Sequence, residues 1–271
     1  MDKINELSKR QKNEERILIA NALDKVRFAN ESNRFQYRSF LDLSEQLKIE
    51  LSFKLRGIGN YELNGGYEDA ERKMLLIYPK QHLENIKDID SYKKERYDIV
   101  IGILRVDLPK ELYGKYEHRT YLGAIMKMGI ERKKIGDILV RDDGADIIIC
   151  RDVEVYLKRN LKDLTRFQKA KVEIVSINKI KYVKKEKDNY RINVKSMRLD
   201  CIVAELARCS RNEANKFIEQ ERVFVNFKEE LVTSKKIEEN TYITIRGKGR
   251  FKVLKIVGTT KSGRLTVLVE K

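Results

Sequence analysis

Closely spaced glycines and cations near the C-terminus are the residues best suited to a specific chemistry. The run Arg246-Gly247-Lys248-Gly249-Arg250 places two glycines between three cations, directly after an alternating apolar pattern that predicts a strand at 242–246. Glycine lets backbone N–H groups approach an anion, and Lys and Arg add positive charge, so the run is typical of a phosphate-contacting loop. The Gly-x-x-x-x-Gly-Lys-Ser/Thr spacing of a nucleotide P-loop is absent. The pattern therefore favours the phosphates of a polymer over a bound mononucleotide.

A second group of cations lies on two predicted helices between residues 198 and 222. The first helix has one apolar stripe at helical spacing, formed by Leu199, Ile202, Val203 and Leu206. The second begins at Ser210, which forms a Ser-x-x-Glu capping box with Glu213, and it buries Ala214, Phe217 and Ile218. Packing these stripes inward leaves a basic outer surface. Its cations are Arg198, Arg208, Arg211, Lys216 and Arg222.

The charge balance indicates a polyanionic partner. The chain has 271 residues, with 58 Lys and Arg against 42 Asp and Glu, which gives a formal net charge of +16. From residue 181 onward there are 22 basic against 12 acidic residues, so +10 of that charge lies in the last third. Nucleic acid and anionic lipid are the common partners of such a surface. No predicted helix has the broad apolar face with Trp or Phe that interfacial helices use, which favours nucleic acid. A lipid-binding module, a protein-only adaptor and a generally basic, solvated surface remain alternatives.

The first part of the chain predicts an α+β domain. The first fifty residues predict helix, with apolar residues at roughly helical spacing from Ile17 to Val26. A second helix is expected to begin near Asp42 or Ser44, with Ser44 as a candidate N-cap. The pair Asn64-Gly65 predicts a tight turn, because both residues tolerate positive φ. A buried strand follows at 74–78, and we place a domain boundary between residues 79 and 97.

The middle of the chain predicts the element order β-α-β-β-α-β. The strands are expected at 97–106, 135–140, 145–150 and 171–177, and the helices at 118–128 and 153–161. This is the split-βαβ, ferredoxin-like topology that RNA-recognition motifs share with many unrelated domains. Such motifs stack bases on aromatic residues of the central strands, but here only Tyr97 is aromatic on the first strand. We expect an RRM-like fold without the usual base-stacking face, acting as a scaffold or docking unit. Residues 179–195 predict a basic linker, with room for a hairpin of its own.

The last part predicts two helices followed by strands at 223–226, 242–246, 251–257 and 265–270, and here a family resemblance emerges. The region resembles the S-four RNA-binding domain, named after ribosomal small-subunit protein four. The resemblance rests on Arg198-Leu-Asp200, Ser210-Arg211, Ala214, Ile218, Val223-x-Val225-Asn226 and the later Ile-x-Ile-Arg246 strand. The whole chain resembles the bacterial YlmH family. Supporting stretches are Phe40-Leu-Asp42, Gly65-Gly-Tyr-Glu68, Ala70-Glu-Arg72, Leu75-Leu-Ile-Tyr-Pro79, His118-Arg-x-Tyr-Leu-Gly123 and Lys134-Ile-Gly-Asp-Ile-Leu-Val140.

The resemblance implies a multi-domain α+β protein: an N-terminal α+β domain at 1–85, an RRM-like domain at 86–180 and an S-four-type domain at 190–271. It further implies a non-enzymatic RNA-binding protein of the bacterial cytoplasm that binds structured ribosomal RNA. The expected partner is the large ribosomal subunit, with tRNA as a further candidate. The expected role is in translation or ribosome-associated quality control, with a link to cell division. We expect a monomer that has no cofactor, binds no metal and does not associate with a membrane.

Carried over position by position, the resemblance implies one RNA-facing set on the last domain. Together with the cations above, the set is Arg198, Arg208, Ser210, Arg211, Ala214, Asn215, Lys216, Arg222, Asn226, Arg246, Lys248 and Arg250. The chain departs from the S-four pattern at two positions where glycine is usual, because it has Glu221 and Phe227 there. Both positions often need positive φ, so either the helix end and the turn are distorted or Asn226 takes the left-handed conformation.

An RNA-modifying enzyme, or its accessory subunit, is the main alternative. Arg198-Leu-Asp200 is superficially similar to the catalytic aspartate motif of pseudouridine synthases, but it lies at the start of an apolar-striped helix. We therefore expect Asp200 to cap that helix or to pair with an Arg. His82 and His118 lie far from any Cys at metal-ligand spacing. The three Cys, at 150, 201 and 209, fit a reducing cytoplasm better than a disulfide framework.

Overall fold

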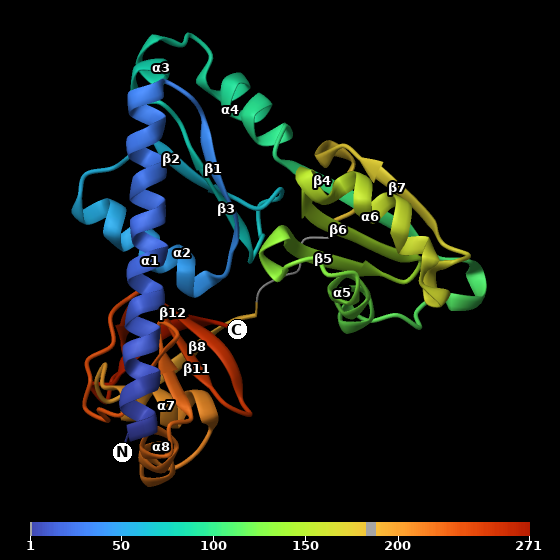
Figure 1. Cartoon of the computed structure of the whole chain (residues 1–271). Coiled ribbons are helices and arrows are strands. Elements are labelled where there is room, and N and C mark those ends of the chain that lie inside the picture. The colour runs from blue at the N-terminus through green and yellow to red at the C-terminus, as the bar shows by residue number, and fades with distance from the viewer. Residues whose placement is uncertain (1, 183–187) are drawn as a thin grey trace. The chain divides into compact units, whose positions relative to one another are not determined.

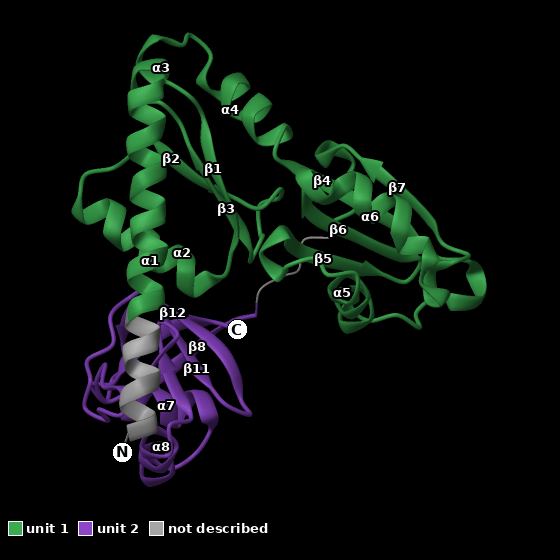
Figure 2. Ribbon diagram, viewed as in Figure 1, with its two compact units in different colours: residues 1–183 green, residues 184–271 purple. Residues whose placement is uncertain are grey.

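The computed structural model describes residues 2–182 and 188–271, with side chains described from residue 13 onward. The chain has the predicted mixed α+β composition and more than one structural part. Its helices and strands are labelled in Figure 1, and its two compact units, residues 1–183 and 184–271, are coloured separately in Figure 2. The finer division into three domains at 1–85, 86–180 and 190–271 stays a prediction.

A three-stranded sheet covered by two helices forms the first part of unit 1. Its elements are α1 (Asp2–Ser32), β1 (Gln36–Leu41), α2 (Leu43–Leu55), β2 (Tyr61–Asn64) and β3 (Lys73–Ile77), and the antiparallel sheet has the order β1-β3-β2. Side chains of α1 and α2, including Leu18, Ile49 and Phe53, form one core with Leu75 and Ile77 of β3. The prediction of helix throughout the first fifty residues was wrong at 36–41, which form β1. The predicted second helix is present. Its N-cap is Asp42, which forms a capping box with Glu45, so the expectation of Ser44 as the cap was wrong.

The predicted tight turn at Asn64-Gly65 was wrong, because residues 65–72 form a longer loop between β2 and β3. Positive φ occurs at Gly66 and not at Asn64. Asp137, on the strand β5 (Ile135–Arg141), holds this loop from outside: its carboxylate accepts hydrogen bonds from the Tyr67 hydroxyl at 2.8 Å and from two loop backbone N–H groups at 2.7 and 3.1 Å. Contacts distant in sequence therefore replace the local turn.

Two helices, α3 (Lys80–Asn85) and α4 (Ile89–Asp98), lead into a four-stranded antiparallel sheet. Its elements follow the predicted β-α-β-β-α-β order and the strands lie in the order β5-β6-β4-β7. They are β4 (Ile101–Asp107), α5 (His118–Lys127), β5, β6 (Gly144–Cys150), α6 (Glu154–Asn160) and β7 (Lys171–Val175). Tyr97 lies in α4, so the prediction that it begins the first strand was wrong. The one aromatic residue expected on that strand is thus absent from it.

Both faces of this four-stranded sheet are buried. On one face, Leu104 and Val106 of β4 and Ile147 and Ile149 of β6 pack with residues of α5 and α6. On the other face, Ile101, Ile103, Ile148 and Cys150 share a core with side chains of the first part of unit 1. Those partners include Phe40, Met74, Leu76 and Tyr78. The surface that an RNA-recognition motif uses for base stacking is therefore occupied by the protein's own side chains.

Unit 2 consists of a helix pair packed on one face of a six-stranded sheet. The elements are β8 (Asn189–Val194), α7 (Leu199–Ala207), α8 (Arg211–Glu219), β9 (Val223–Val225), β10 (Lys228–Glu229), β11 (Thr241–Ile245), β12 (Gly249–Thr259) and β13 (Leu265–Glu270). The strand order is β10-β9-β11-β12-β13-β8. The interpretation of 179–195 as a linker was wrong from residue 189 onward, because β8 pairs antiparallel with β13. Residues 183–187 lie outside the described residues.

The helix pair and the inward side chains of the sheet share one hydrophobic core. Leu199, Ile202, Val203 and Leu206 of α7 are buried in it, as their spacing predicts, with Ala214 and Ile218 of α8. The sheet contributes Val223, Val225, Ile243, Ile245, Phe251 and Val253. Because side chains alternate along a strand, the intervening residues point away from the helices.

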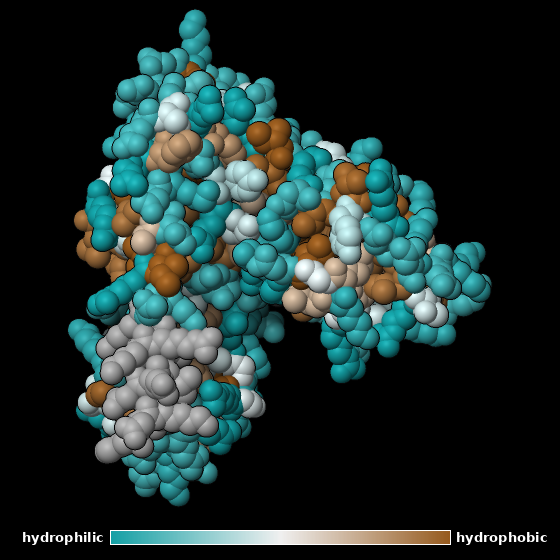
Figure 3. All heavy atoms as spheres, viewed as in Figure 1, coloured by the Kyte–Doolittle hydropathy of each residue, from teal (hydrophilic) through white to brown (hydrophobic). Residues whose placement is uncertain are grey.

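The visible surface is mainly hydrophilic, with hydrophobic patches on unit 1 (Figure 3). Exposed apolar side chains there include Leu51 and Leu55 on α2, which are 61% and 76% exposed. Among the described residues, no helix combines the length and apolar composition needed to cross a bilayer.

Asp137→Ala should loosen the loop 65–72. The substitution leaves two backbone N–H groups and the Tyr67 hydroxyl without their acceptor, which costs about 1–3 kcal/mol of folding free energy. We expect a lower thermal midpoint and faster hydrogen exchange of loop amides, measured by mass spectrometry. Asp142→Ala, at an exposed turn position, serves as the control. Equal exchange in the two variants would show that Asp137 does not hold the loop.

Candidate nucleic-acid interface

A buried carboxylate organises the start of the helix pair. Asp200, in the first turn of α7, has a side chain only 2% exposed. It accepts hydrogen bonds from Nε and Nη2 of Arg198 at 3.2 and 2.9 Å, and from Nε and Nη2 of Arg211 at 3.1 and 2.7 Å. The prediction that Asp200 pairs with an Arg is confirmed, and it pairs with two. The side chains of Arg198 and Arg211 remain 42% and 51% exposed, so each guanidinium is fixed yet accessible.

The pairing keeps Asp200 ionised. Burial alone would raise the pKa of its carboxyl, but hydrogen bonds from Arg198 and Arg211 outweigh burial and hold the pKa well below its ordinary value. Two guanidinium groups against one carboxylate leave a net positive charge at this position. The cluster therefore still attracts an anion.

The first turn of α8 is fixed by the predicted capping box. The Ser210 hydroxyl accepts a hydrogen bond from the Glu213 backbone N–H at 3.2 Å, and the Glu213 carboxylate accepts one from the Ser210 N–H at 2.9 Å. Ser210 thus has a structural task at the helix end. Ala214 is fully buried, so the expectation that it faces RNA was wrong. Its small side chain packs within the core that joins the two helices.

The second turn of α8 lies near the turn between β11 and β12. Backbone and side-chain hydrogen bonds from Ser210 lower the pKa of Glu213, and the charges of Lys216 and Lys248 lower it further. Both lysines are exposed, and the charge of each acts on the same carboxylate. Asn215, beside Lys216, is half-buried, and its side-chain oxygen has no hydrogen-bond partner within the described part of the chain. The helix pair and the basic turn thus present charge to the same region of solvent.

Arg222 joins the end of α8 to that turn. Its Nη2 donates to the carbonyl oxygen of Arg246 at 3.2 Å, and the Arg246 N–H donates to the carbonyl oxygen of Arg222 at 2.9 Å. The guanidinium carbon of Arg222 lies 4.5 Å from the ring centroid of Phe217. We call the surface formed by Arg198, Arg208, Arg211, Lys216, Arg222 and Lys248 the helix face. Arg208 caps the end of α7 with φ of +53° and is exposed.

Two of the predicted cations do not belong to the helix face. The guanidinium of Arg246 lies 4.9 Å from the ring centroid of Phe224, and that of Arg250 lies 5.2 Å from the ring centroid of Phe227. Phe224 alternates with buried Val223 and Val225, so its ring is on the sheet face opposite the helices. The predicted set is therefore divided between two faces of unit 2.

The two residues that depart from the S-four pattern, Glu221 and Phe227, have a left-handed backbone conformation, and so does Asn226. Glu221, Asn226 and Phe227 have φ values of +58°, +47° and +65°. Asn226 stabilises the turn with its side chain, whose oxygen accepts a hydrogen bond from the Tyr242 N–H at 2.9 Å. The turn is thus formed despite the missing glycine, and Phe227 bears a conformational cost of about 1–2 kcal/mol.

Sequence reasoning missed the aromatic residues around these arginines. Phe224, Phe227 and Tyr242 are half-buried, and Lys252 lies 5.3 Å from the Tyr242 ring centroid. The available signal was strand alternation, because Phe224 and Tyr242 each stand between two buried positions. Pairing Phe224 with Thr244, and Thr244 with Arg250, needed the strand register that only the structure supplies.

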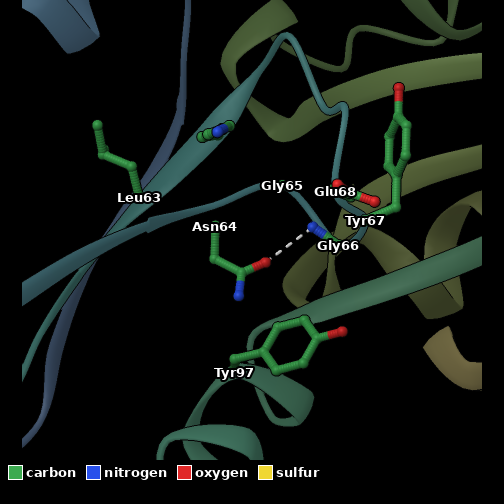
Figure 4. Close-up of a pocket in the computed structure, with 8 residues that line it drawn as sticks. Leu63, Asn64, Gly65, Gly66, Tyr67, Glu68 and Tyr97 are labelled. Atoms are coloured by element: carbon green, nitrogen blue, oxygen red, sulfur yellow. Dashed lines mark hydrogen bonds between the residues drawn. The ribbon is translucent and has the colours of Figure 1, made fainter. Parts of the chain in front are cut away.

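Two pockets in the described part of unit 1 contain no predicted RNA-facing residue. Figure 4 shows a polar pocket of about 330 Å³ around Asn64, Gly66, Tyr67 and Tyr97, where the Asn64 side chain accepts a hydrogen bond from the Gly66 N–H. Burial, together with the nearby Asp98 and Glu62 charges, raises the pKa of Tyr97 to about 12. A second pocket, of about 280 Å³, lies beside α5.

The pocket beside α5 is basic. Its lining includes Arg119, Lys127 and Arg166, together with Gly123 and Phe167. Arg119 also pairs with Glu117 at 3.0 Å. No group of three or more potential metal-ligating side chains occurs in the parts of the chain that the structure describes.

Comparison with known proteins finds a family model and relatives that the chain resembles. Residues 93–181 match a family model described as "Putative RNA-binding domain in YlmH". Over 262 residues, 95% of each chain, the sequence is 27% identical to "Ribosome-associated protein quality control protein P2" of Bacillus subtilis (strain 168). These matches support a resemblance of the chain to the YlmH family. The structure is also similar to "Cell division protein ylmH from Streptococcus pneumoniae", with a TM-score of 0.47 and 20% identity, over 61% of this chain and 93% of that one.

The YlmH-family match covers the part whose sheet is buried on both faces. Residues 93–181 include β4, β5, β6 and β7, and the face opposite α5 and α6 packs against the first part of unit 1. The basic pocket that includes Arg119, Lys127 and Arg166 lies within the matched range. Within that range, the helix side therefore presents accessible cations, whereas the opposite sheet face is buried.

Asp200→Asn should destabilise unit 2 and release both arginines. The neutral amide cannot replace the ionised acceptor, so we expect a loss of about 1–3 kcal/mol, moderated by the exposure of both guanidinium groups. Because folding lowers the pKa of Asp200, its contribution is complete at neutral pH. It decreases as pH falls below the ordinary aspartate value of about 3.9.

Hydrogen exchange of α7 and α8 amides and thermal denaturation at pH 7 and pH 3 measure this effect. Glu205→Gln, an exposed substitution on the same helix, is the matched control. If Asp200→Asn matches the control at pH 7, the carboxylate does not organise the helix pair.

Proposed function

We propose that this protein is a non-enzymatic RNA-binding protein of the bacterial cytoplasm. Residues 190–271 form an S-four-type domain that binds structured ribosomal RNA, and residues 86–180 form an RRM-like, ferredoxin-like domain. The observation that carries the proposal is the helix face, where Asp200 fixes two accessible arginines and Lys216 and Lys248 converge. The family description and the Bacillus relative's name support an RNA-binding, ribosome-associated role.

Phosphate contacts explain how the helix face would bind. Folded RNA presents closely spaced phosphates, and cations held in fixed positions neutralise them without reading bases. Arg198 and Arg211 are pre-positioned by Asp200, so fewer side-chain rotamers are lost on binding. Affinity would then depend strongly on salt and weakly on sequence.

Unit 1 has a different task in this proposal. Because the sheet of the middle domain is buried on both faces, that domain cannot stack bases as an RNA-recognition motif does. We propose that it orients the protein on the ribosome and that any RNA contact it makes uses the helix side, around Arg119, Lys127 and Arg166. The description of residues 93–181 as RNA-binding supports such a contact.

The partner in this proposal is the large ribosomal subunit, with tRNA as a further contact, and the protein acts as a monomer. The name of the Bacillus relative supports a task in translation quality control, and the name of the Streptococcus protein is the basis for a link to cell division. Sequencing RNA cross-linked to the protein in cells would identify the ribosomal helix.

An RNA-modifying enzyme, or its accessory subunit, is the competing function. Asp200 is the residue that raised it, and both of its oxygens are occupied by arginine hydrogen bonds. We expect ribosomal RNA from a deletion strain to keep every modified nucleotide when analysed by mass spectrometry. Loss of a modification that returns with the wild-type gene, and fails to return with an Asp200→Asn gene, would establish the enzymatic function instead.

Replacing two lysines of the helix face should weaken RNA binding. If about six phosphates are neutralised, the logarithm of affinity falls with the logarithm of salt concentration at a slope of about −4 to −5. Lys216→Gln with Lys248→Gln removes two cations, so we expect the slope to become shallower by about 1.5 and the affinity to fall roughly tenfold. Fluorescence anisotropy with ribosomal RNA hairpins at several salt concentrations measures both.

The matched control is Lys261→Gln with Arg264→Gln, which removes the same charge at the turn between β12 and β13. This control should bind nearly as well as the wild type. Lys216 and Lys248 are preferred to Arg211 as targets, because Arg211 also stabilises Asp200. Equal slopes and affinities for both double variants would contradict the assignment of the helix face.

A further inference from the structure

The face of the unit 2 sheet that points away from the helices carries aromatic rings and cations in alternation. Phe224 on β9 pairs with Thr244 on β11, which pairs with Arg250 on β12, and in the next row Tyr242 pairs with Lys252. Phe227, in the turn between β9 and β10, lies 5.6 Å from the Tyr242 ring, centroid to centroid. We call this surface the aromatic face; it consists of Phe224, Phe227, Tyr242, Arg246, Arg250 and Lys252.

The three rings have no role in the hydrophobic core. None of them belongs to the core cluster of unit 2 or packs against it among the partly buried side chains of the described residues. Instead each ring has a cation over it: Arg246 over Phe224 at 4.9 Å, Arg250 over Phe227 at 5.2 Å and Lys252 over Tyr242 at 5.3 Å. Burial in the fold therefore does not account for these rings.

The backbone at Phe227 supports a role for its ring. Its φ of +65° lies in the left-handed region, where glycine or asparagine is far less strained than a bulky residue. A strained residue that packs into no core points to a task outside folding. Its ring extends the surface formed by Tyr242.

Flat rings beside guanidinium groups form the chemistry that recognises unpaired nucleobases. Bases stack on aromatic rings and on arginine planes irrespective of sequence, and the cations donate hydrogen bonds to the phosphates that join the bases. Paired bases are stacked inside a helix and cannot reach such rings. Resting on the proposed function, we propose that the aromatic face binds an unpaired segment of RNA by stacking its bases, while the helix face binds paired RNA through phosphates.

Charge at the border of the aromatic face indicates where the strand enters. Glu229 is paired with Phe224 across β10 and β9, and Glu270 is paired with Lys252 across β13 and β12. These carboxylates are on the lateral strands β10 and β13, whereas the end of the face where β11 meets β12 is the basic turn 246–250. An RNA strand would enter over this turn, because carboxylates repel its phosphates at the other borders.

The test compares two fluorescent RNAs, a blunt duplex and the same duplex with an unpaired overhang that contains 2-aminopurine. Wild-type protein should bind the overhang RNA more tightly and quench the 2-aminopurine. Phe224→Leu with Tyr242→Leu keeps apolar side chains but removes two rings, and it should weaken overhang binding about tenfold, as expected when base stacking is lost. Its affinity for the blunt duplex and its salt slope should not change.

Two further variants separate stacking from folding. Tyr242→Phe keeps the ring and should retain both quenching and overhang preference. Phe227→Gly removes a ring while relieving the left-handed backbone, so it should weaken overhang binding without lowering the thermal midpoint. A parallel arm measures co-sedimentation with phosphatidylglycerol vesicles, where neither wild type nor variants should bind.

Overhang preference that survives in the leucine variant would overturn this inference and leave the proposed function intact. So would vesicle binding that the leucine substitutions abolish, since the rings would then serve a lipid surface. Failure of the wild type to bind either RNA would overturn both proposals. Both proposals are supported if two results are obtained together. Only the Lys216→Gln with Lys248→Gln variant loses duplex binding, and only the leucine variant loses the preference for the overhang RNA.

Discussion

The basic surface of unit 2 depends on one buried carboxylate. Asp200 is almost wholly excluded from water, and an ionised aspartate in that position requires hydrogen-bond donors. Arg198 and Arg211 supply them from the start of each helix, so the requirement of a buried charge also fixes the two cations. The capping box at Ser210 then fixes the start of α8. The hydrogen bond from Arg222 to the carbonyl of Arg246 fixes the basic turn relative to the end of that helix.

A second constraint concerns the sheet of unit 1. Ile103 and Ile148 would be exposed if the middle sheet stood alone, and the side chains of Phe40, Met74 and Leu76 bury them. The same contact occupies the surface on which similar folds bind RNA. The strand order alone would allow RNA to bind on the sheet. The packing of the sheet covers that face, so any RNA contact must use another surface, and the fold alone does not identify the binding surface.

Local patterns predicted much of this structure, and non-local contacts explain most of the errors. The capping box at Ser210, the stripe of α7 and the β-α-β-β-α-β order were readable because each depends on neighbouring residues. The strand β8 was missed because its partner, β13, lies some seventy residues away and its lysine-rich surroundings imitate a linker. For the same reason the cations of the candidate site were identifiable by type, but their division between two sheet faces required strand register.

The pairing of β8 with β13 has a consequence for how unit 2 forms during synthesis. In this unit β8 is synthesised first and β13 last, and β8 lies at the edge of the sheet beside β13. The sheet therefore cannot be completed until residues 265–270 have left the ribosomal tunnel. Until then β8 and β12 expose unpaired backbone edges, which are prone to aggregation. Folding of unit 2 is therefore expected to be a late, cooperative event in translation. The two sheets formed by residues 36–175 can assemble earlier.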